Sequence, residues 1–351
     1  MIPDHKRYIE PFFGGGALYF HLQPSSALIN DSSRDLMSFY RQVKEQDPEM
    51  QACLLSYGNG FAAMLELVRS RITMLLDIFE LLPVDEDAAS EALSTLLDRW
   101  MPEILSLFSR SVIHNTLAFR KELERSVWDK LVRTWANHKK RPFSPEDLAE
   151  NLATGFASGF YMYARQIYND CSLGKKVLPD GKKCANFFFV REMCYGSMFR
   201  YNTKGEFNIP YGGMSYNSKD FSGKVQSIFT PEMKSLFSGT EIHCSDFEDF
   251  LNHAAPTRDD FIFLDPPYDT EFSDYEGAAF TRLDHARLAL ALSRTKAKFL
   301  LIIKETPFIS GLYSQGFYVQ SFDKQYTYNV RSRNDRSAQH LIVTNYETNL
   351  D

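Results

Sequence analysis

Short apolar runs at both ends of the chain predict buried β-strands. Near the start, residues 8–11 and 27–31 are strand candidates. Each is followed by apolar residues at three- and four-residue spacing, one series from Ala17 and one behind a helix-capping serine, Ser32 or Ser33. Strands that alternate with helices in this way predict a mostly parallel α/β sheet.

The last third of the chain returns to the same pattern. Runs that are apolar at every position suit parallel strands buried on both faces. Strands are predicted at 241–245, 261–264, 299–303, 318–327 and 340–345, with a helix at 284–292. The last two strands are joined by a connection, 328–336, that is short enough for a hairpin, so we expect them to be antiparallel.

A different pattern separates these two regions. Residues 61–169 show helical spacing of apolar positions, and Ser144 followed by Pro145 predicts the start of one helix. Residues 171–223 are rich in Gly, Lys, Tyr and Asn, which predicts loops and a hairpin. The pattern therefore divides the chain into a core part at 1–48, a helical and hairpin insertion at 49–235, and a second core part at 236–351.

Composition narrows the class of protein. With 351 residues, 44% apolar and 24% charged, the chain is typical of a globular protein with a sizeable core. It lacks an apolar run long enough to cross a bilayer and a secretion signal at its start, so the expected compartment is the cytoplasm. Five dispersed cysteines suit a reducing compartment. Cys171, Cys184 and Cys194 offer a zinc site as an alternative, but their spacing favours plain thiols, and no metal is predicted.

Charge is unevenly distributed along the chain. The net charge is −6, but residues 170–234 contain ten Lys and Arg against six Asp and Glu, a local balance of +4 that leaves −10 for the rest. A basic segment in an acidic chain suits a protein that grips a phosphate backbone with one face. The alternative is that this basic segment is simply a solvated surface with no partner.

The tetrapeptide Asp265-Pro266-Pro267-Tyr268 directly follows the strand predicted at 261–264. In an open parallel sheet, ligands bind beyond the carboxyl ends of the strands, so this is where a site is expected. The two prolines also suit a simple turn that closes a strand.

A glycine-rich turn follows the first predicted strand. Gly14, Gly15 and Gly16 lie between that strand and a helix, where they let a ligand approach the backbone closely. Asp31 stands at the end of the next strand, where a carboxylate can accept hydrogen bonds from ribose hydroxyls. Nicotinamide enzymes share this arrangement, but the third glycine of their fingerprint is not at its usual place.

Taken together, three segments in this order resemble the Dam-type adenine methyltransferases, the D12 class. They are residues 10–17 (EPFFGGGA), 29–31 (IND) and 265–268 (DPPY), separated by an insertion. Within the insertion, 200–210 (RYNTKGEFNIP) is similar to the DNA-recognition hairpin of that family almost residue for residue. The resemblance covers about 8–40 and 186–346 and implies a Rossmann-like methyltransferase fold with an inserted DNA-recognition region.

The resemblance also implies a set of functional residues. The catalytic residues would be Asp265, Pro266, Pro267 and Tyr268. The cofactor S-adenosyl-L-methionine would be held by Glu10, Pro11, Phe12, Gly14, Gly16, Asp31, Asp246, Phe247 and Asp265. Double-stranded DNA would be contacted by Tyr195, Arg200, Asn202, Lys204, Asn208 and Pro210, with Arg200 and Pro210 reading bases in a GATC-like site and Tyr195 entering the base stack.

These residues suit methylation of an adenine amino group. That nitrogen is a poor nucleophile because its lone pair is delocalised into the ring. Asp265 and the carbonyl of Pro266 can accept its two hydrogens, while Tyr268 offers a face for stacking worth about 1–3 kcal/mol. Alignment of donor and acceptor can lower the barrier by roughly 7–11 kcal/mol. A base inside a duplex must first be flipped out.

Three departures from the family pattern bear on these expectations. The family usually carries a Trp/Gly/Gly/Lys segment before the glycine loop, whereas seven residues precede Tyr8 here; either the start is truncated or the pocket is completed otherwise. Gly196 stands where bacterial Dam enzymes have Asn, which weakens the expectation for Tyr195. The helical insertion is also longer than usual.

Two other functions remain open from the sequence. The first is an adenine methyltransferase that acts on RNA, although the 200–210 hairpin favours duplex DNA. The second is a DNA-binding relative without catalytic activity, which the short start favours and the intact 265–268 motif opposes. For the main interpretation we expect a monomer or weak dimer, with a restriction endonuclease as a further partner.

Overall fold

The computed structural model describes residues 2–197, 200–269, 274–275, 278–325 and 337–348. The chain forms two compact units. One combines residues 1–45 with 231–351, and the other consists of residues 46–230.

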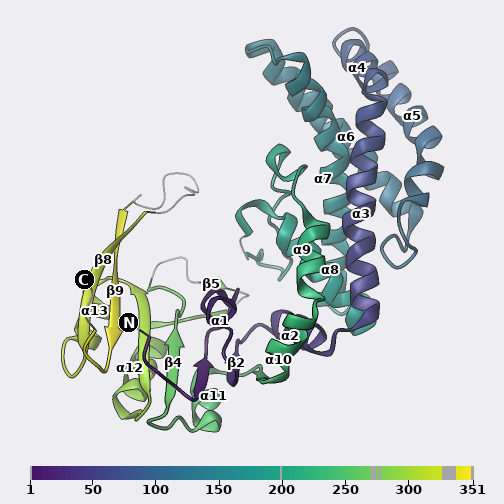
Figure 1. Ribbon diagram of the computed structural model, residues 1–351. Helices are drawn as coiled ribbons and strands as arrows, with labels where there is room; N and C mark the ends of the chain where they lie inside the picture. Colours follow the sequence, from purple (N-terminus) through teal and green to yellow (C-terminus); the bar gives the residue numbers. More distant parts are fainter. Residues whose placement is uncertain (1, 198–199, 270–273, 276–277, 326–336, 349–351) are drawn as a thin grey trace. The chain divides into compact units, whose positions relative to one another are not determined.

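The first unit is built on a seven-stranded sheet (Figure 1). Its strands are β1 (Arg7–Glu10), β2 (Ala27–Asn30), β3 (Thr240–His243), β4 (Asp260–Leu264), β7 (Lys298–Lys304), β8 (Tyr318–Gln325) and β9 (Ser337–Thr344), in the order β3-β2-β1-β4-β7-β9-β8. The five strands from β3 to β7 are parallel, and β9 pairs antiparallel with both β7 and β8. A separate two-stranded ladder joins β5 (Asp274–Tyr275) and β6 (Ala278–Ala279). The predicted Rossmann-like α/β class, with its terminal antiparallel pair, is confirmed; the 328–336 connection lies within the undescribed part of the chain.

Helices cover both faces of this sheet. One face packs on α11 (Phe247–Ala254), α12 (Arg282–Arg294) and α13 (Pro307–Tyr313), through strand residues such as Ile9, Ile262 and Leu301. The opposite face carries Tyr8 and packs on α1 (Ala17–Leu22), α2 (Arg34–Glu45) and α10 (Pro231–Ser238) through an aromatic cluster. Side chains alternate along a strand, so burying the sheet on both sides requires these all-apolar runs.

The parallel strands bring four acidic residues to one side of the sheet, the edge formed by the carboxyl ends of the strands. β1 ends in Glu10, while Asp31, Asp246 and Asp265 lie just beyond the carboxyl ends of β2, β3 and β4. β1 pairs directly with β4, so the glycine loop and the 265–268 segment follow neighbouring strands.

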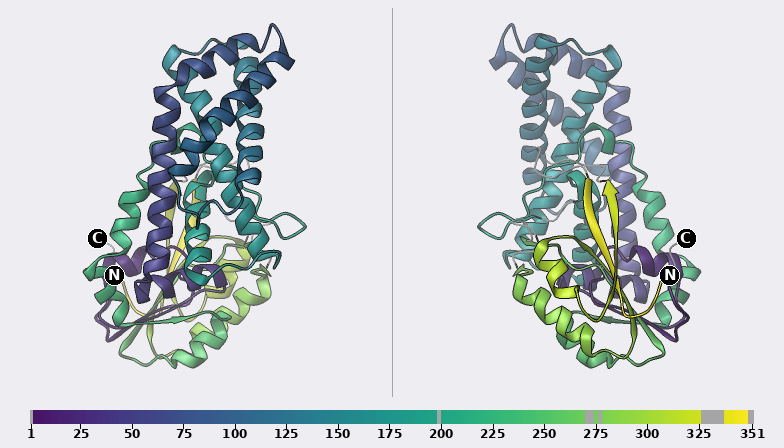
Figure 2. Two further views of the ribbon diagram at one scale, coloured as in Figure 1. Left: turned by 90° about the vertical axis from the view of Figure 1, so that its right-hand side faces the viewer. Right: turned by 90° about the vertical axis from the view of Figure 1, so that its left-hand side faces the viewer.

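The second unit is helical. Its helices are α3 (Pro48–Ser70), α4 (Ile72–Leu81), α5 (Glu86–Ser106), α6 (Thr116–Lys140), α7 (Pro145–Ser172), α8 (Asp180–Met193) and α9 (Phe221–Ile228), with short 3₁₀ turns at Tyr195–Ser197 and Met214–Tyr216. The long helices α3, α6 and α7 run side by side (Figure 2). Helix α7 begins as predicted, because the Ser144 hydroxyl accepts from the Asp147 amide and Pro145 occupies the first turn.

The prediction of loops and a hairpin over 171–223 is wrong for its middle part, where α8 lies. Lys182, Lys183 and Asn186 interrupt the apolar pattern, yet Asn186 is 2% exposed and donates to the Tyr57 hydroxyl and the Ala164 carbonyl. Tertiary contacts thus satisfy a polar residue that the sequence pattern assigned to a loop.

Two further features bear on the class of protein. Among the helices that the structure describes, none combines the length and the apolarity needed to cross a membrane. Cys184 and Cys194 are buried and Cys171 is partly buried. Within the described residues these three cysteines form no group with metal-ligand spacing.

Candidate active site

The glycine loop folds tightly over the end of β1. Gly14 and Gly16 have φ values of 49° and 64°, in the left-handed region that favours glycine. The Gly14 amide donates to Oδ2 of Asp31 at 2.9 Å, and the Gly16 amide donates to the Phe13 carbonyl at 2.7 Å. A Cβ atom added to Gly14 or Gly15 would meet nothing within 4 Å, so the outer side of the loop is open to a ligand.

Asn30 joins the segments that follow three strands. It ends β2 and is 1% exposed. Its side-chain amide donates to the carbonyls of Pro11 (3.0 Å) and Ser245 (3.1 Å), and its Oδ1 accepts from the Ser245 amide at 2.9 Å. One side chain therefore fixes the glycine loop relative to the segment that carries Asp246. Sequence reasoning did not select Asn30, although a polar residue that ends an apolar strand was a usable signal.

Glu10 is the most unusual carboxyl group at this edge. It is 2% exposed, and the Tyr8 hydroxyl donates to its Oε2 at 2.8 Å. Burial raises the pKa of Glu10 to about 8; the Tyr8 hydrogen bond opposes this shift, and the charges of Asp265 and Asp31 add to it. The three carboxyl groups are therefore close enough to interact, and together they favour a cationic ligand.

The 265–268 segment leaves β4 beside this acidic group. Asp265 is exposed, Pro266 is buried, and Pro267 and Tyr268 are half-buried. The Tyr268 ring packs edge-on against His340 of β9, with ring centroids 5.3 Å apart. Directly after it, Asp269 accepts from Thr306 at 3.1 Å and from Arg282 at 3.2 Å. The segment is thus held by β4 at its start and by the contacts of Tyr268 and Asp269 at its end. The Asp265 carboxylate remains accessible.

An aromatic group lies beside the glycine loop. Phe12, Phe247 and Phe280 contact one another, with ring centroids 5.5–5.7 Å apart. Arg287 of α12 lies over the Phe247 ring, with its guanidinium carbon 4.9 Å from the centroid.

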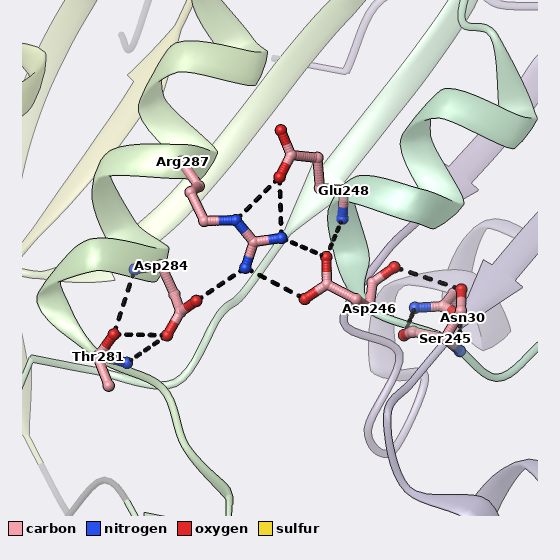
Figure 3. Close-up of polar contacts among 7 residues, drawn as sticks. All are labelled: Asn30, Ser245, Asp246, Glu248, Thr281, Asp284 and Arg287. Carbon is pink, nitrogen blue, oxygen red and sulfur yellow. Dashed lines mark hydrogen bonds and ion pairs between the residues drawn. The ribbon is translucent and has the colours of Figure 1, made fainter.

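Arg287 also binds three carboxylates (Figure 3). Its guanidinium donates to Asp246 (2.7 Å), Glu248 (2.8 Å) and Asp284 (2.9 Å), and these contacts raise the pKa of Arg287. Asp246 in turn caps α11 by accepting from the Glu248 amide at 2.9 Å. Asp246 and Phe247 are thus fixed together by one cation from a neighbouring helix. No sequence signal pointed to Arg287.

The predicted hairpin is present in the helical unit. Tyr201 and Phe207 form an antiparallel bridge, and the Asn202 amide donates to the Glu206 carbonyl at 2.9 Å. The turn is closed by Gly205, whose φ is 75°, and by Oδ1 of Asn202, which accepts from the Lys204 amide at 2.9 Å.

Buried contacts anchor this hairpin on α7. Phe207 and Ile209 are each 1% exposed. Asn169 exchanges two hydrogen bonds with the backbone of Phe207, and the Tyr161 hydroxyl donates to the Ile209 carbonyl at 2.8 Å. Arg200, Lys204 and Pro210 are exposed, and Nε of Arg200 donates to Asn208 at 3.2 Å. These contacts thus hold the base of the hairpin on α7, while the positively charged side chain of Arg200 remains exposed.

Tyr195 lies next to the hairpin base. Its amide donates to the Pro210 carbonyl at 2.9 Å, and the residue is 41% exposed. Gly196 follows with φ of 65°, and its amide donates to the Tyr216 hydroxyl at 3.1 Å. A glycine at this position gives Tyr195 a backbone turn that an asparagine would adopt less readily.

The residues predicted for cofactor binding and catalysis thus gather at one edge of the sheet, while the predicted DNA contacts gather on the hairpin of the other unit. The acidic edge also fits the charge of S-adenosylmethionine, which carries a sulfonium and an ammonium. The open glycine turn leaves room for its chain, and the Phe12 and Phe247 rings offer faces for its adenine.

Comparison with known proteins agrees with this geometry. The sequence model of the D12 class N6 adenine-specific DNA methyltransferase family matches residues 1–57 and 126–329. Type II methyltransferase M.CviBI from Paramecium bursaria Chlorella virus NC1A is 32% identical over 166 residues, which are 46% of this chain and 60% of that protein. Type II methyltransferase M.MjaIII from Methanocaldococcus jannaschii is 26% identical over 354 aligned residues, covering 97% of this chain and 89% of that protein.

A third relative extends the similarity to bacterial enzymes. The DNA adenine methylase of Haemophilus influenzae is 29% identical over 137 residues, which are 36% of this chain and 45% of that protein. The family match extends over most of the chain and includes both the glycine loop and the 265–268 segment. The chain therefore belongs to the D12 class of N6 adenine-specific DNA methyltransferases.

Proposed function

We propose that this enzyme transfers a methyl group from S-adenosylmethionine to the N6 atom of an adenine that is flipped out of duplex DNA. The observation that carries the proposal is the position of the glycine loop and of Asp265-Pro266-Pro267-Tyr268 after the neighbouring strands β1 and β4. In such sheets the crevice beyond the strand ends is the place where ligands bind.

The cofactor would lie along this edge. Glu10 and the loop at Gly14 and Gly16 would hold its methionine part, with Pro11 and Phe12 completing the turn, and Asp31 would accept from its ribose. Asp31 already accepts from the amides of Gly14 and Ser33, so its carboxylate is fixed in place. Asp246 and Phe247 would meet the adenine ring. When bound, the cofactor supplies a methyl group already activated by a positively charged sulfur.

Asp265 would orient the target base. Its exposed carboxylate and the Pro266 carbonyl can accept both amino hydrogens, which turns the nitrogen lone pair toward the methyl group. Pro267 keeps the segment rigid, and Tyr268 offers a stacking face. One carbon–nitrogen bond forms as one carbon–sulfur bond breaks, S-adenosylhomocysteine leaves, and the surplus amino proton passes to water.

The hairpin would read the DNA. Arg200 is exposed at its edge, and an arginine that reaches guanine in the major groove is the commonest specific base contact. Lys204 would contact phosphate, Asn202 and Asn208 would shape the turn and the Arg200 side chain, and Pro210 and Tyr195 would approach the bases. The family match favours DNA over RNA as the substrate.

The names of two relatives support a role in restriction and modification. M.CviBI and M.MjaIII are named type II methyltransferases. We infer that this enzyme likewise protects a short DNA site, with a restriction endonuclease that cuts the same site as its partner.

The test supplies methyl-labelled S-adenosylmethionine together with duplex DNA or an RNA duplex of matched sequence. We expect label in N6-methyladenine of the DNA alone, and sequencing of modified adenines should place it in one short motif. Label in RNA, or in cytosine, would overturn the proposal. Calorimetry with S-adenosylhomocysteine at two temperatures tests the cofactor separately, since a protein that does not bind it cannot follow this scheme.

A further inference from the structure

Two histidines and a glutamate meet at the outer edge of the sheet. Glu241 and His243 lie on the edge strand β3, and His253 lies on α11. One ligand atom from each residue falls within 4.8 Å of the others. The two imidazole rings have centroids 4.7 Å apart, and His243 also packs on Phe250 of α11 at 5.3 Å.

The backbone explains why these groups converge. Residues two apart on a strand point to the same face, so Glu241 and His243 both face α11. Helix α11 follows β3 through a short connection that Asp246 caps, and this places His253 in its last turn beside them. The arrangement therefore comes from a fixed strand–turn–helix unit.

The Nε2 atom of His243 is the member of this group whose bonding the described residues do not explain. This atom is buried and has no hydrogen-bond partner among the described residues. The nearest carboxylate oxygen, Oε2 of Glu241, is 3.5 Å away, within ion-pair range but outside hydrogen-bond geometry. A buried polar atom of this kind normally has a partner.

A metal ion would satisfy all three side chains at once. We propose that Glu241, His243 and His253 bind a divalent ion of the zinc type, with water completing its coordination. Imidazole and carboxylate ligands suit zinc, cobalt or nickel, whereas magnesium and calcium prefer oxygen ligands alone. Bonds of about 2.1 Å in a tetrahedral site separate ligand atoms by about 3.4 Å. The Glu241 side chain is 67% exposed, so the surrounding solvent leaves it room to move by the distance this requires.

Such an ion would tie β3 to α11. The segment between them carries Asp246 and Phe247, so the ion would stiffen the part of the chain that faces the proposed cofactor. The site itself does not depend on methyl transfer, and its failure or success leaves the proposed function untouched.

The test uses untagged protein treated with a chelator, then titrated with zinc or cobalt chloride in a calorimeter. We expect one ion per chain, a rise in melting temperature, and, for cobalt, visible absorption of a four- or five-coordinate ion. His253→Gln changes an exposed helix position that should not disturb folding, and it should weaken binding at least about tenfold. His243→Gln and Glu241→Gln should weaken it as well.

His21→Gln is the matched control, since His21 is an exposed histidine on α1 of the same unit. It should leave affinity, stoichiometry and the rise in melting temperature unchanged. If wild-type protein binds no ion in a saturable way, or if His253→Gln binds it as tightly as the control, the proposed metal site is wrong.

Discussion

The Tyr8 hydroxyl donates a 2.8 Å hydrogen bond to the carboxylate of Glu10, two residues along the same strand, and both side chains are buried. This bond stabilises the ionised form of an acid whose burial favours the neutral form. Because the pKa of Glu10 is raised to about 8, most of this carboxyl group is protonated at neutral pH before a cation binds.

Cofactor affinity should therefore rise with pH. A cationic ligand prefers ionised Glu10, so below about pH 8 the Kd for S-adenosylmethionine should increase by up to about tenfold for each unit of acidification. Calorimetry between pH 6 and 8 measures this directly. Tyr8→Phe removes the stabilising donor and should move the profile to higher pH. Glu10→Gln should bind weakly and lose this dependence; an equally steep profile in that variant would assign the titration to another group.

Asp265→Ala should abolish methyl transfer while leaving DNA binding nearly intact. Asp265 is exposed and lies just beyond the end of β4, so its loss should remove orientation of the amino group without unfolding the protein. Labelled methyl transfer and DNA affinity are measured on the same preparation. Activity above a few per cent of wild type would show that Asp265 does not orient the base.

Arg200→Ala and Lys204→Ala form a matched pair on the hairpin. If Arg200 reads a base, its loss should relax preference at one base pair by about 1–3 kcal/mol. Lys204→Ala should instead weaken all sequences alike and reduce the salt dependence of binding. Methylation rates on a set of sites with single base changes distinguish the two. A uniform loss for Arg200→Ala would make it a phosphate contact.

Arg287→Met should weaken cofactor binding by about tenfold, or about 1.4 kcal/mol. The guanidinium holds Asp246 and covers Phe247, and its removal frees both from α12. Exposed ion pairs are individually weak, but three carboxylates on one arginine form a network. Arg287→Lys keeps the positive charge but lacks the planar guanidinium, so this variant should recover only part of the cofactor affinity. Unchanged affinity for S-adenosylhomocysteine in Arg287→Met would limit Arg287 to a structural role.

The sequence predicts the sheet well because each parallel strand is an apolar run bounded by a turn. It also predicts the hairpin, since Asn202 and Gly205 carry the turn within a few residues. It predicts far less where distant segments meet. Helix α8 was missed because its polar residues are satisfied only by tertiary contacts. Asn30 and two of the three ion pairs of Arg287 likewise depend on residues far away in the chain, which no local pattern reveals.

Strands β2 and β3 are hydrogen-bonded neighbours, from Ala27 opposite Thr240 to Asn30 opposite His243, although the whole helical unit separates them in the chain. Helices α2 and α10, on either side of that excursion, pack against each other. The pairing of β2 with β3 therefore does not depend on the length of the polypeptide inserted between them. An insertion or deletion within the helical unit should therefore leave β2, β3 and the adjoining Asp31 and Asp246 in place.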